Sequence, residues 1–119
     1  MGITSLSITV TNPTNQKKAT KLDFIIDSGA IYSVVPSSVL AKLGIKPDQE
    51  REFILANGQR IKRKLGIARF LYEKRSGGAS VVFGQKDDTT LLGATTLEAM
   101  GFALDPFKRD LLPLPMILG

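Results

Sequence analysis

The sequence predicts a mainly β protein with two short helices. Two observations support this fold class. Polar and apolar residues alternate along several short segments, and residues typical of turns separate those segments. Only residues 37–45 and 95–101 have the spacing of a helix. With 119 residues, 43% hydrophobic and 23% charged, the composition is that of a soluble globular protein, so we expect residues 1–119 to form a single domain.

The expected strands share this alternation, and turn residues set their limits. They cover residues 5–11, 21–27, 30–36, two arms within 52–66, 67–74 and 79–84. Asn12 followed by Pro13 ends the first strand. Asn57 followed by Gly58 is the strongest short signal of a hairpin, so the two arms that flank it are expected to pair. The Ser-Gly-Gly run at 76–78 is expected to form the turn between the last two strands.

The two helical segments carry start and stop signals. Residues 37–45 begin with a serine, which is expected to cap the helix, and Gly44 lies at its C-terminal end. In the second segment Thr95 and Glu98 have the spacing of a capping box, and Gly101 is expected to close the helix.

The chain contains no His and no Cys. This composition excludes Ser-His-Asp and Cys-His catalysis, zinc sites built from Cys and His, and disulfides. Every apolar run is too short to cross a membrane as a helix. We therefore expect no cofactor, no metal and no membrane association, and a cytoplasmic location.

The net charge of +5 is modest, and part of it lies in the run RIKRK at residues 60–64. Ile61 and Leu65 place apolar side chains at strand-like spacing within and after this run. A solvated strand face is therefore the favoured interpretation, and we expect no nucleic-acid binding. A preference for acidic peptides is a less favoured alternative.

The stretch KLDFIIDSGAIYSVVP, residues 21–36, places one carboxylate, Asp27, directly after Phe-Ile-Ile. A carboxylate is costly to bury, so this position is expected to have a structural or chemical use. Gly29 allows a tight backbone path, and the Ser28 hydroxyl is expected to tie the loop down. A rigid acid in an apolar setting suits acid/base chemistry. The structural alternative is a turn aspartate that hydrogen-bonds its own loop.

Asp27 opens the only Asp-Ser/Thr-Gly motif of the sequence. Amide hydrolysis requires a base that activates water and an acid that protonates the leaving nitrogen, and two carboxylates that share one proton perform both tasks. The other acids, such as Asp87, Asp88 and Asp105, lie in turn-like or charged segments. A second copy of the chain across a two-fold axis is the simplest source of an equivalent carboxylate, which predicts a homodimer.

Three motifs together resemble those of retropepsin-like aspartic proteases. FIIDSGAIYSVVP, residues 24–36, is similar to the active-site segment of that family, where apolar residues precede Asp-Thr/Ser-Gly-Ala. LLGATTLEAMG, residues 91–101, is similar to the second family element, two apolar residues and a glycine before a short helix. LANGQRI, residues 55–61, lies between them, where the family places its flap hairpin. The resemblance is strongest to the small single-domain prokaryotic members.

The resemblance implies a closed β-barrel that forms a homodimer, with the active site at the subunit interface. Asp27 would be the catalytic acid, paired with Asp27 of a second copy. Ser28 would brace the two active-site loops across the dimer, while Gly29 and Ala30 would offer backbone groups to the substrate. The flap tip would comprise Ala56, Asn57, Gly58 and Gln59. The supporting loop would comprise Leu91, Leu92 and Gly93.

An enzyme of this kind is an aspartic endopeptidase that uses water as its nucleophile, needs no metal or cofactor, and binds an extended peptide by strand addition. The chain departs from many members by having Ser28 in place of Thr and a single central glycine, Gly58, in the flap. A second function fits the same fold, namely a catalytically silent dimerisation or peptide-binding module. The intact Asp-Ser-Gly motif favours the enzyme, because a module without catalysis has no use for a costly acid there.

Overall fold

The computed structural model describes residues 2–115 and 118, and these form a mainly β fold with two short helices, as the sequence predicts. The elements of this part of the chain are β1 (Ser5–Asn12), β2 (Asn15–Ile26), β3 (Ser33–Pro36), α1 (Ser37–Lys42), β4 (Gln49–Ile54), β5 (Arg60–Tyr72), β6 (Arg75–Gly84), β7 (Leu91–Leu92), α2 (Ala94–Met100), β8 (Phe102–Asp105) and β9 (Asp110–Pro113). Neither helix of the described residues is long and apolar enough to span a membrane.

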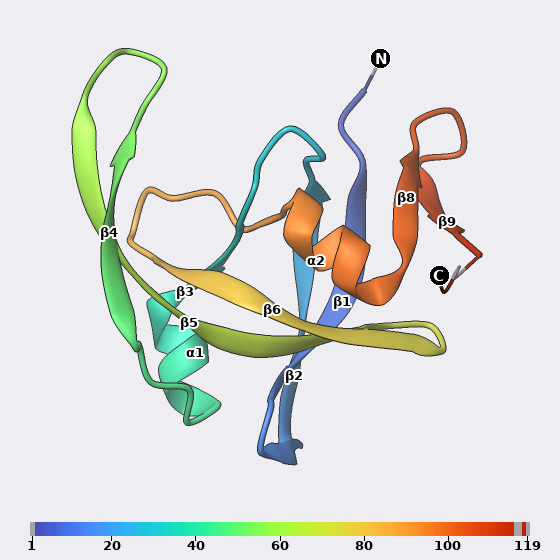
Figure 1. Ribbon diagram of the computed structural model, residues 1–119, viewed down its shortest axis with the longest axis horizontal. Coiled ribbons are helices and arrows are strands. Elements are labelled where there is room, and N and C mark those ends of the chain that lie inside the picture. The colour runs from blue at the N-terminus through green and yellow to red at the C-terminus, as the bar shows by residue number, and fades with distance from the viewer. Residues whose placement is uncertain (1, 116–117, 119) are drawn as a thin grey trace.

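Seven strands form one sheet in the order β1-β2-β7-β3-β6-β5-β4, and β8 pairs with β9 in a separate hairpin. β1 also pairs with β5, so the sheet turns back on itself. β7 is only two residues long but lies between two other strands, parallel to β2 and antiparallel to β3. Figure 1 shows β5 and β6 as a long curved hairpin, with β4 toward one end of it and the β8–β9 hairpin toward the other.

The core is formed by side chains from the sheet and from both helices. Phe24 of β2 and Phe70 of β5 are fully buried and meet edge to face, with their ring centroids 6.1 Å apart. Leu40 of α1 is fully buried, and Leu97 and Met100 of α2 are almost completely buried. Burial of each such side chain contributes about 1.5–3 kcal/mol. Because helices this short are not stable alone, packing on the sheet holds them in place.

The turn between β5 and β6 lies at a different position from the predicted one. Glu73 and Lys74 form this turn, and the Ser-Gly-Gly run at 76–78 lies inside β6, so the predicted turn was wrong. Packing explains the glycine at position 77. A Cβ atom on Gly77 would lie 2.5 Å from the carbonyl carbon and oxygen of Ala99 in α2. The absence of a side chain therefore lets α2 approach β6 closely.

Both helices end at the predicted glycines but begin differently from the prediction. Gly44 and Gly101 have φ angles of 75° and 79°, the left-handed conformation that ends a helix. Pro36 and Gly93 occupy the N-cap positions of α1 and α2, and neither helix has a side-chain capping hydrogen bond. The predicted serine cap and the predicted capping box at Thr95 were therefore wrong.

The β8–β9 hairpin is fastened to the end of β5 by Tyr72. The Tyr72 hydroxyl donates a hydrogen bond to Asp110 Oδ1 at 2.8 Å, and its ring packs edge to face on Phe102 with centroids 5.7 Å apart. Burial, reinforced by the hydrogen bond to Asp110, raises the pKa of Tyr72 to about 12. The phenol therefore remains a neutral donor at physiological pH, and the hairpin stays attached there.

We predict that Gly77→Ala lowers the free energy of unfolding by about 1–3 kcal/mol, because the added methyl group would force α2 away from β6. Gly78→Ala is the matched control, since a Cβ at the neighbouring position would approach no atom closer than 3.8 Å. Its effect should stay within about 0.5 kcal/mol. Urea unfolding followed by circular dichroism measures both variants, and equal destabilisation by the two would contradict the packing explanation.

Candidate active site

Asp27 follows directly on the last residue of β2, where that strand meets β7. Ile25 and Ile26 pair in parallel with Leu91 and Leu92. The ladder continues past the end of β2, because the Asp27 N–H donates a hydrogen bond to the Leu92 carbonyl oxygen at 2.9 Å. The backbone of Asp27 is thus fixed by β7, and Leu91 and Leu92 lie next to the loop that the sequence predicts them to support.

The Asp27 side chain closes a small turn within its own loop. Its Oδ1 atom accepts a hydrogen bond from the Gly29 N–H at 3.0 Å, and its carbonyl oxygen accepts one from the Ala30 N–H at 3.1 Å. The Asp27 side chain is exposed in the single chain, so the expected apolar surroundings are not provided by this chain itself. The Ser28 hydroxyl makes no hydrogen bond within residues 2–115 and 118, and the predicted tie within its own loop was wrong.

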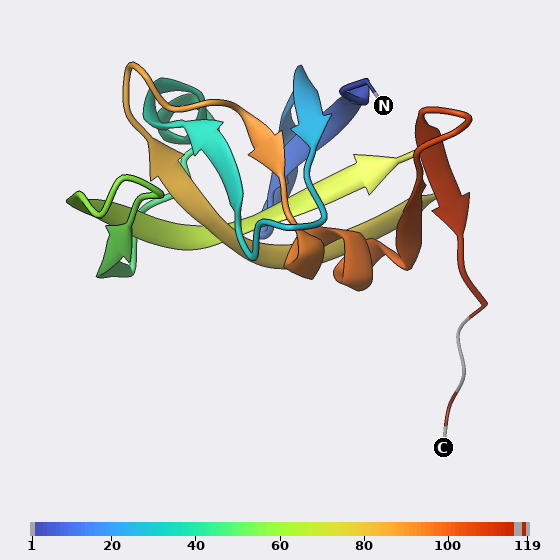
Figure 2. The same cartoon turned by 90° about the horizontal axis from the view of Figure 1, so that it is seen from above.

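The first residues of α2 hold the loop from its other side. The Ala94 N–H donates to the Ala30 carbonyl oxygen at 2.7 Å, and both the N–H and the hydroxyl of Thr95 donate to the Ile31 carbonyl oxygen, at 3.1 and 2.8 Å. The free N–H groups at the start of a helix therefore have partners in the loop. Figure 2 shows the connection from β2 to β3 running beside the start of α2.

Gly93 makes this close contact possible. A Cβ atom at position 93 would lie 2.6 Å from the Tyr32 carbonyl oxygen and 2.9 Å from that of Ala30. Any side chain there would push α2 and the loop apart. The glycine of the predicted supporting segment is therefore required by the proximity of two backbones.

Two fully buried hydroxyl groups, Ser33 and Thr96, join β3 to α2 behind the loop. Their Oγ atoms are hydrogen-bonded to each other, and the Ser33 Oγ also accepts the Gly93 N–H at 3.0 Å. A buried hydroxyl without a partner is costly, so this pair specifies how α2 sits against the loop. Sequence reasoning missed both residues. The available signal was that Ser33 and Val35 alternate on one face of an apolar strand, which places a polar group inward.

A groove of about 670 Å³ lies between the Asp27 loop and the β4–β5 hairpin. Its lining residues are Gly29, Ala30, Ile31, Tyr32, Val34, Phe53, Ile54, Leu55, Ile61, Arg63, Val82, Asp87, Asp88, Thr89 and Leu91. Most of the lining is apolar, which suits the side chains of a peptide. Asp27 itself is not among the lining residues, but Gly29 and Ala30 of the same loop are.

The β4–β5 hairpin carries the predicted flap tip. The Leu55 N–H donates to the Gln59 carbonyl oxygen at 2.8 Å, and the Asn57 side chain accepts the Gln59 N–H at 2.9 Å. Gly58 has a φ angle of 85°, which favours glycine. Ala56 and the three residues after it are exposed and do not line the groove in the single chain.

Tyr32 connects the Asp27 loop to this hairpin. Its ring meets that of Phe53 edge to face, with centroids 6.2 Å apart, and its hydroxyl accepts a hydrogen bond from Arg51 Nη1 at 2.6 Å. The Arg51 guanidinium also lies 5.9 Å from the centre of the Tyr32 ring. Sequence reasoning missed Tyr32, Arg51 and Phe53, because Tyr32 lies 19 residues or more from the other two in the chain and no local pattern marks their contact.

Arg63 and Asp88 form an ion pair at the wall of the groove. Arg63 Nε donates to Asp88 Oδ2 at 2.7 Å and Arg63 Nη2 to Oδ1 at 3.0 Å, and the two side chains are only 18% and 23% exposed. The hydrogen bonds from Arg63 lower the pKa of Asp88, and the same contact raises the pKa of Arg63. Asp88 Oδ2 also accepts the Gln85 N–H at 2.7 Å, so this pair fixes the 85–88 turn against β5.

No group of three or more metal-ligating side chains gathers anywhere in residues 2–115 and 118. What distinguishes the Asp27 carboxylate is that it is exposed on a loop that β7 and α2 hold by backbone hydrogen bonds.

Comparison with known proteins defines the class of protein. The family model described as aspartyl protease matches residues 8–96, a span that contains Asp27, the hairpin and β7. The chain therefore belongs to the aspartyl protease family. No curated protein matches the chain as a relative.

Two solved structures share the fold. The Simian Foamy Virus (mac) protease is 22% identical, with a TM-score of 0.56, over 79% of this chain and 91% of that one. A retropepsin-like aspartic protease from Rickettsia conorii is 23% identical, with a TM-score of 0.53, over 88% of this chain and 90% of that one. The family match and these two structures confirm the resemblance to retropepsin-like aspartic proteases.

We predict that Asp88→Asn lowers the free energy of unfolding at pH 7 by about 1–2 kcal/mol, because it removes the charge from a bidentate ion pair. The pKa of Asp88 is lowered in the folded chain, so its stabilisation is present above the ordinary carboxyl pKa of about 4 and is lost as the pH falls through the folded value. The difference between parent and variant should therefore shrink below about pH 4.

Urea unfolding of the parent and of Asp88→Asn at a series of pH values measures this difference. Asp87→Asn is the matched control, because Asp87 is exposed and its side chain makes no hydrogen bond within the described residues. The ion pair would be contradicted if the difference in free energy of unfolding between the parent and Asp88→Asn stayed constant down to strongly acidic pH.

Proposed function

We propose that this chain is an aspartic endopeptidase whose active site forms at a homodimer interface, with Asp27 from each copy activating a water molecule. The observation that carries the proposal is the Asp27 loop. Its carboxylate is exposed at the surface of a single chain, yet its backbone is fixed by β7 and by the start of α2. A rigidly held, exposed acid beside an apolar groove is suited to meet an equivalent acid across a two-fold axis.

The chemistry follows from two carboxylates that face each other. Like charges a few ångströms apart cannot both ionise, so the pair holds one proton. The ionised member accepts a proton from water, which attacks the peptide carbonyl, while the protonated member donates to the carbonyl oxygen. As the tetrahedral intermediate collapses, a proton passes to the leaving nitrogen and the C–N bond breaks. Dimerisation would also remove Asp27 from bulk water, which a single chain does not do.

The remaining site residues would act through binding and positioning. Gly29 and Ala30 line the groove and would hydrogen-bond an extended peptide through their backbone groups. Ser28, whose hydroxyl is free within the described part of its own chain, would brace the loop of the second copy. The hairpin tip, Ala56 to Gln59, would close over the peptide. Residues 1–119 would act as one domain with a closed barrel, consistent with the pairing of β1 with β5.

A catalytically silent peptide-binding or dimerisation module remains the second candidate. One contact favours it: Asp27 accepts a hydrogen bond from the Gly29 N–H, which is what a purely structural turn aspartate does. The two candidates differ in a single measurable property, since only the enzyme loses a chemical activity when the charge of Asp27 is removed.

We predict that the parent chain cleaves members of a mixed peptide library between pH 4 and 8 and that Asp27→Asn reduces cleavage at least about a hundredfold. Activity should fall as the pH rises and both carboxylates of the pair ionise. Asp48→Asn, which changes an exposed aspartate outside the groove, should leave cleavage unchanged. Size-exclusion at the assay concentration checks that all three chains are dimers. If the parent chain is folded and dimeric but cleaves no peptide over this pH range, the catalytically silent module becomes the favoured function.

A further inference from the structure

A second groove, of about 750 Å³, lies on the opposite face of β5 from the candidate active-site groove. The alternation of side chains along two strands separates the grooves. On β5, Ile61 lines the first groove, whereas Lys62 and Lys64 line the second. On β6, Val82 lines the first and Phe83 lines the second. Because successive residues of a strand face opposite sides of a sheet, the second groove opens on the other side of β5 from the Asp27 site, although Arg63 lines both grooves.

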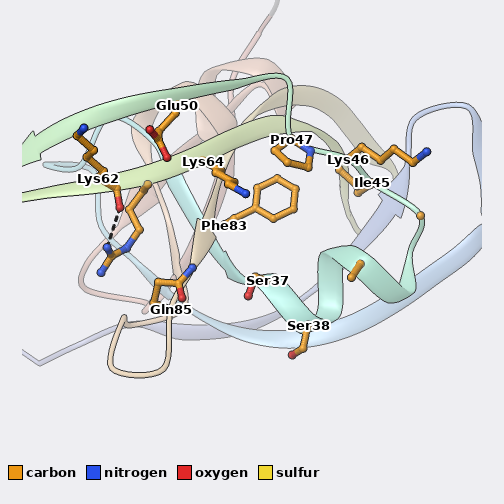
Figure 3. A pocket seen from close by; sticks show the side chains of 13 residues that line it. Ser37, Ser38, Ile45, Lys46, Pro47, Glu50, Lys62, Lys64, Phe83 and Gln85 are labelled. Carbon is orange, nitrogen blue, oxygen red and sulfur yellow. Dashed lines mark hydrogen bonds between the residues drawn. The ribbon is translucent and has the colours of Figure 1, made fainter.

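The floor and walls of the second groove combine apolar and polar groups. The apolar part is formed by Ile45, Pro47 and the ring of Phe83. Figure 3 shows the side chains of Lys64, Ser37 and Gln85 around that ring. None of these three side chains makes a hydrogen bond within the described residues, so their polar groups are free for a ligand.

The charge of this groove is positive. Its lining includes Lys46, Lys62 and Lys64, and Glu50 is its only acidic residue. Arg63 also lines it, but its charge is already paired with Asp88. None of the three lysines forms an ion pair in the part of the chain that the structure describes.

The register of the hairpin does not neutralise these lysines. Glu50 and Glu52 lie opposite Lys64 and Lys62 in the β4–β5 ladder. Glu52, however, pairs with Arg60 at 2.7 Å, and Glu50 forms no ion pair within the described residues. An anionic ligand in this groove would therefore meet three ammonium groups, with the carboxylate of Glu50 as the competing negative charge in the lining.

We propose that this groove binds an acidic polypeptide segment, with carboxylates against Lys62 and Lys64 and a neighbouring apolar side chain against the exposed Pro47. A peptide fits better than a nucleic acid, because base stacking needs an open aromatic face and the Phe83 side chain is only 6% exposed. Ser37 and Gln85 supply hydrogen-bond donors for a carboxylate. This binding is independent of peptide cleavage at Asp27, so it holds for either candidate function.

The test measures binding by fluorescence anisotropy on the full chain carrying Asp27→Asn, so that the probe is not cleaved. The probe is a short labelled peptide of glutamates with one central phenylalanine. A peptide with glutamine in place of each glutamate and a single-stranded oligothymidylate of the same length serve as comparison ligands. We predict that the acidic peptide binds most tightly and that its affinity falls with increasing salt.

We further predict that the double change Lys62→Gln and Lys64→Gln weakens binding of the acidic peptide about fivefold to tenfold. The matched control is Lys74→Gln with Lys108→Gln, which removes the same charge from two exposed lysines outside the groove. This control should change the affinity less than about twofold at 0.15 M salt, because screening acts over about 8 Å. Equal weakening by both pairs, equal affinity for the glutamine peptide, or tighter binding of the oligonucleotide would each overturn the proposal.

Discussion

The structure depends on the backbone hydrogen bonds that fix the Asp27 loop. They come from a part of the chain more than sixty residues later: Leu92 accepts the Asp27 N–H, and Ala94 and Thr95 donate to the loop carbonyls. Forming contacts between segments this far apart in the chain costs conformational entropy. The rest of the fold must therefore position β7 and α2 next to the Asp27 loop. The buried core between the sheet and both helices supplies the free energy that does so.

The same strands build two grooves of different character. Side chains on one face of β5 and β6 complete an apolar groove beside the loop, and those on the other face line a groove with free lysines. Arg63 belongs to both linings, and its ion pair with Asp88 fixes the loop before β7 to the hairpin strand. Tyr32 performs a similar task at the Asp27 loop, because it contacts both Phe53 and Arg51 of β4. The hairpin is thus anchored at two points along the apolar groove.

Local sequence predicted the fold class and the helix ends at Gly44 and Gly101, since alternation and positive φ are local properties. It failed where a residue has a partner far away. The glycines at 76–78 suggest a turn, and only the position of Ala99 explains Gly77. The Ser33–Thr96 pair and the Tyr32 contacts join distant segments in the same way. The surroundings of Asp27 could not be predicted from one chain, because its exposed face is completed only by a second copy in the proposed assembly.

The most direct measurement of the central claim is a mixing experiment on peptide cleavage. Parent chain is held constant while a ninefold excess of Asp27→Asn is added and allowed to exchange, at a concentration where both are dimers. If each active site needs Asp27 from two copies, random pairing should reduce cleavage to about one-tenth of the parent value. The same excess of Asp48→Asn, which retains Asp27, should instead raise cleavage about tenfold, because every added chain completes active dimers. Cleavage that stays at the parent value or rises above it in the presence of Asp27→Asn would contradict the shared site, because one Asp27 per dimer would then suffice.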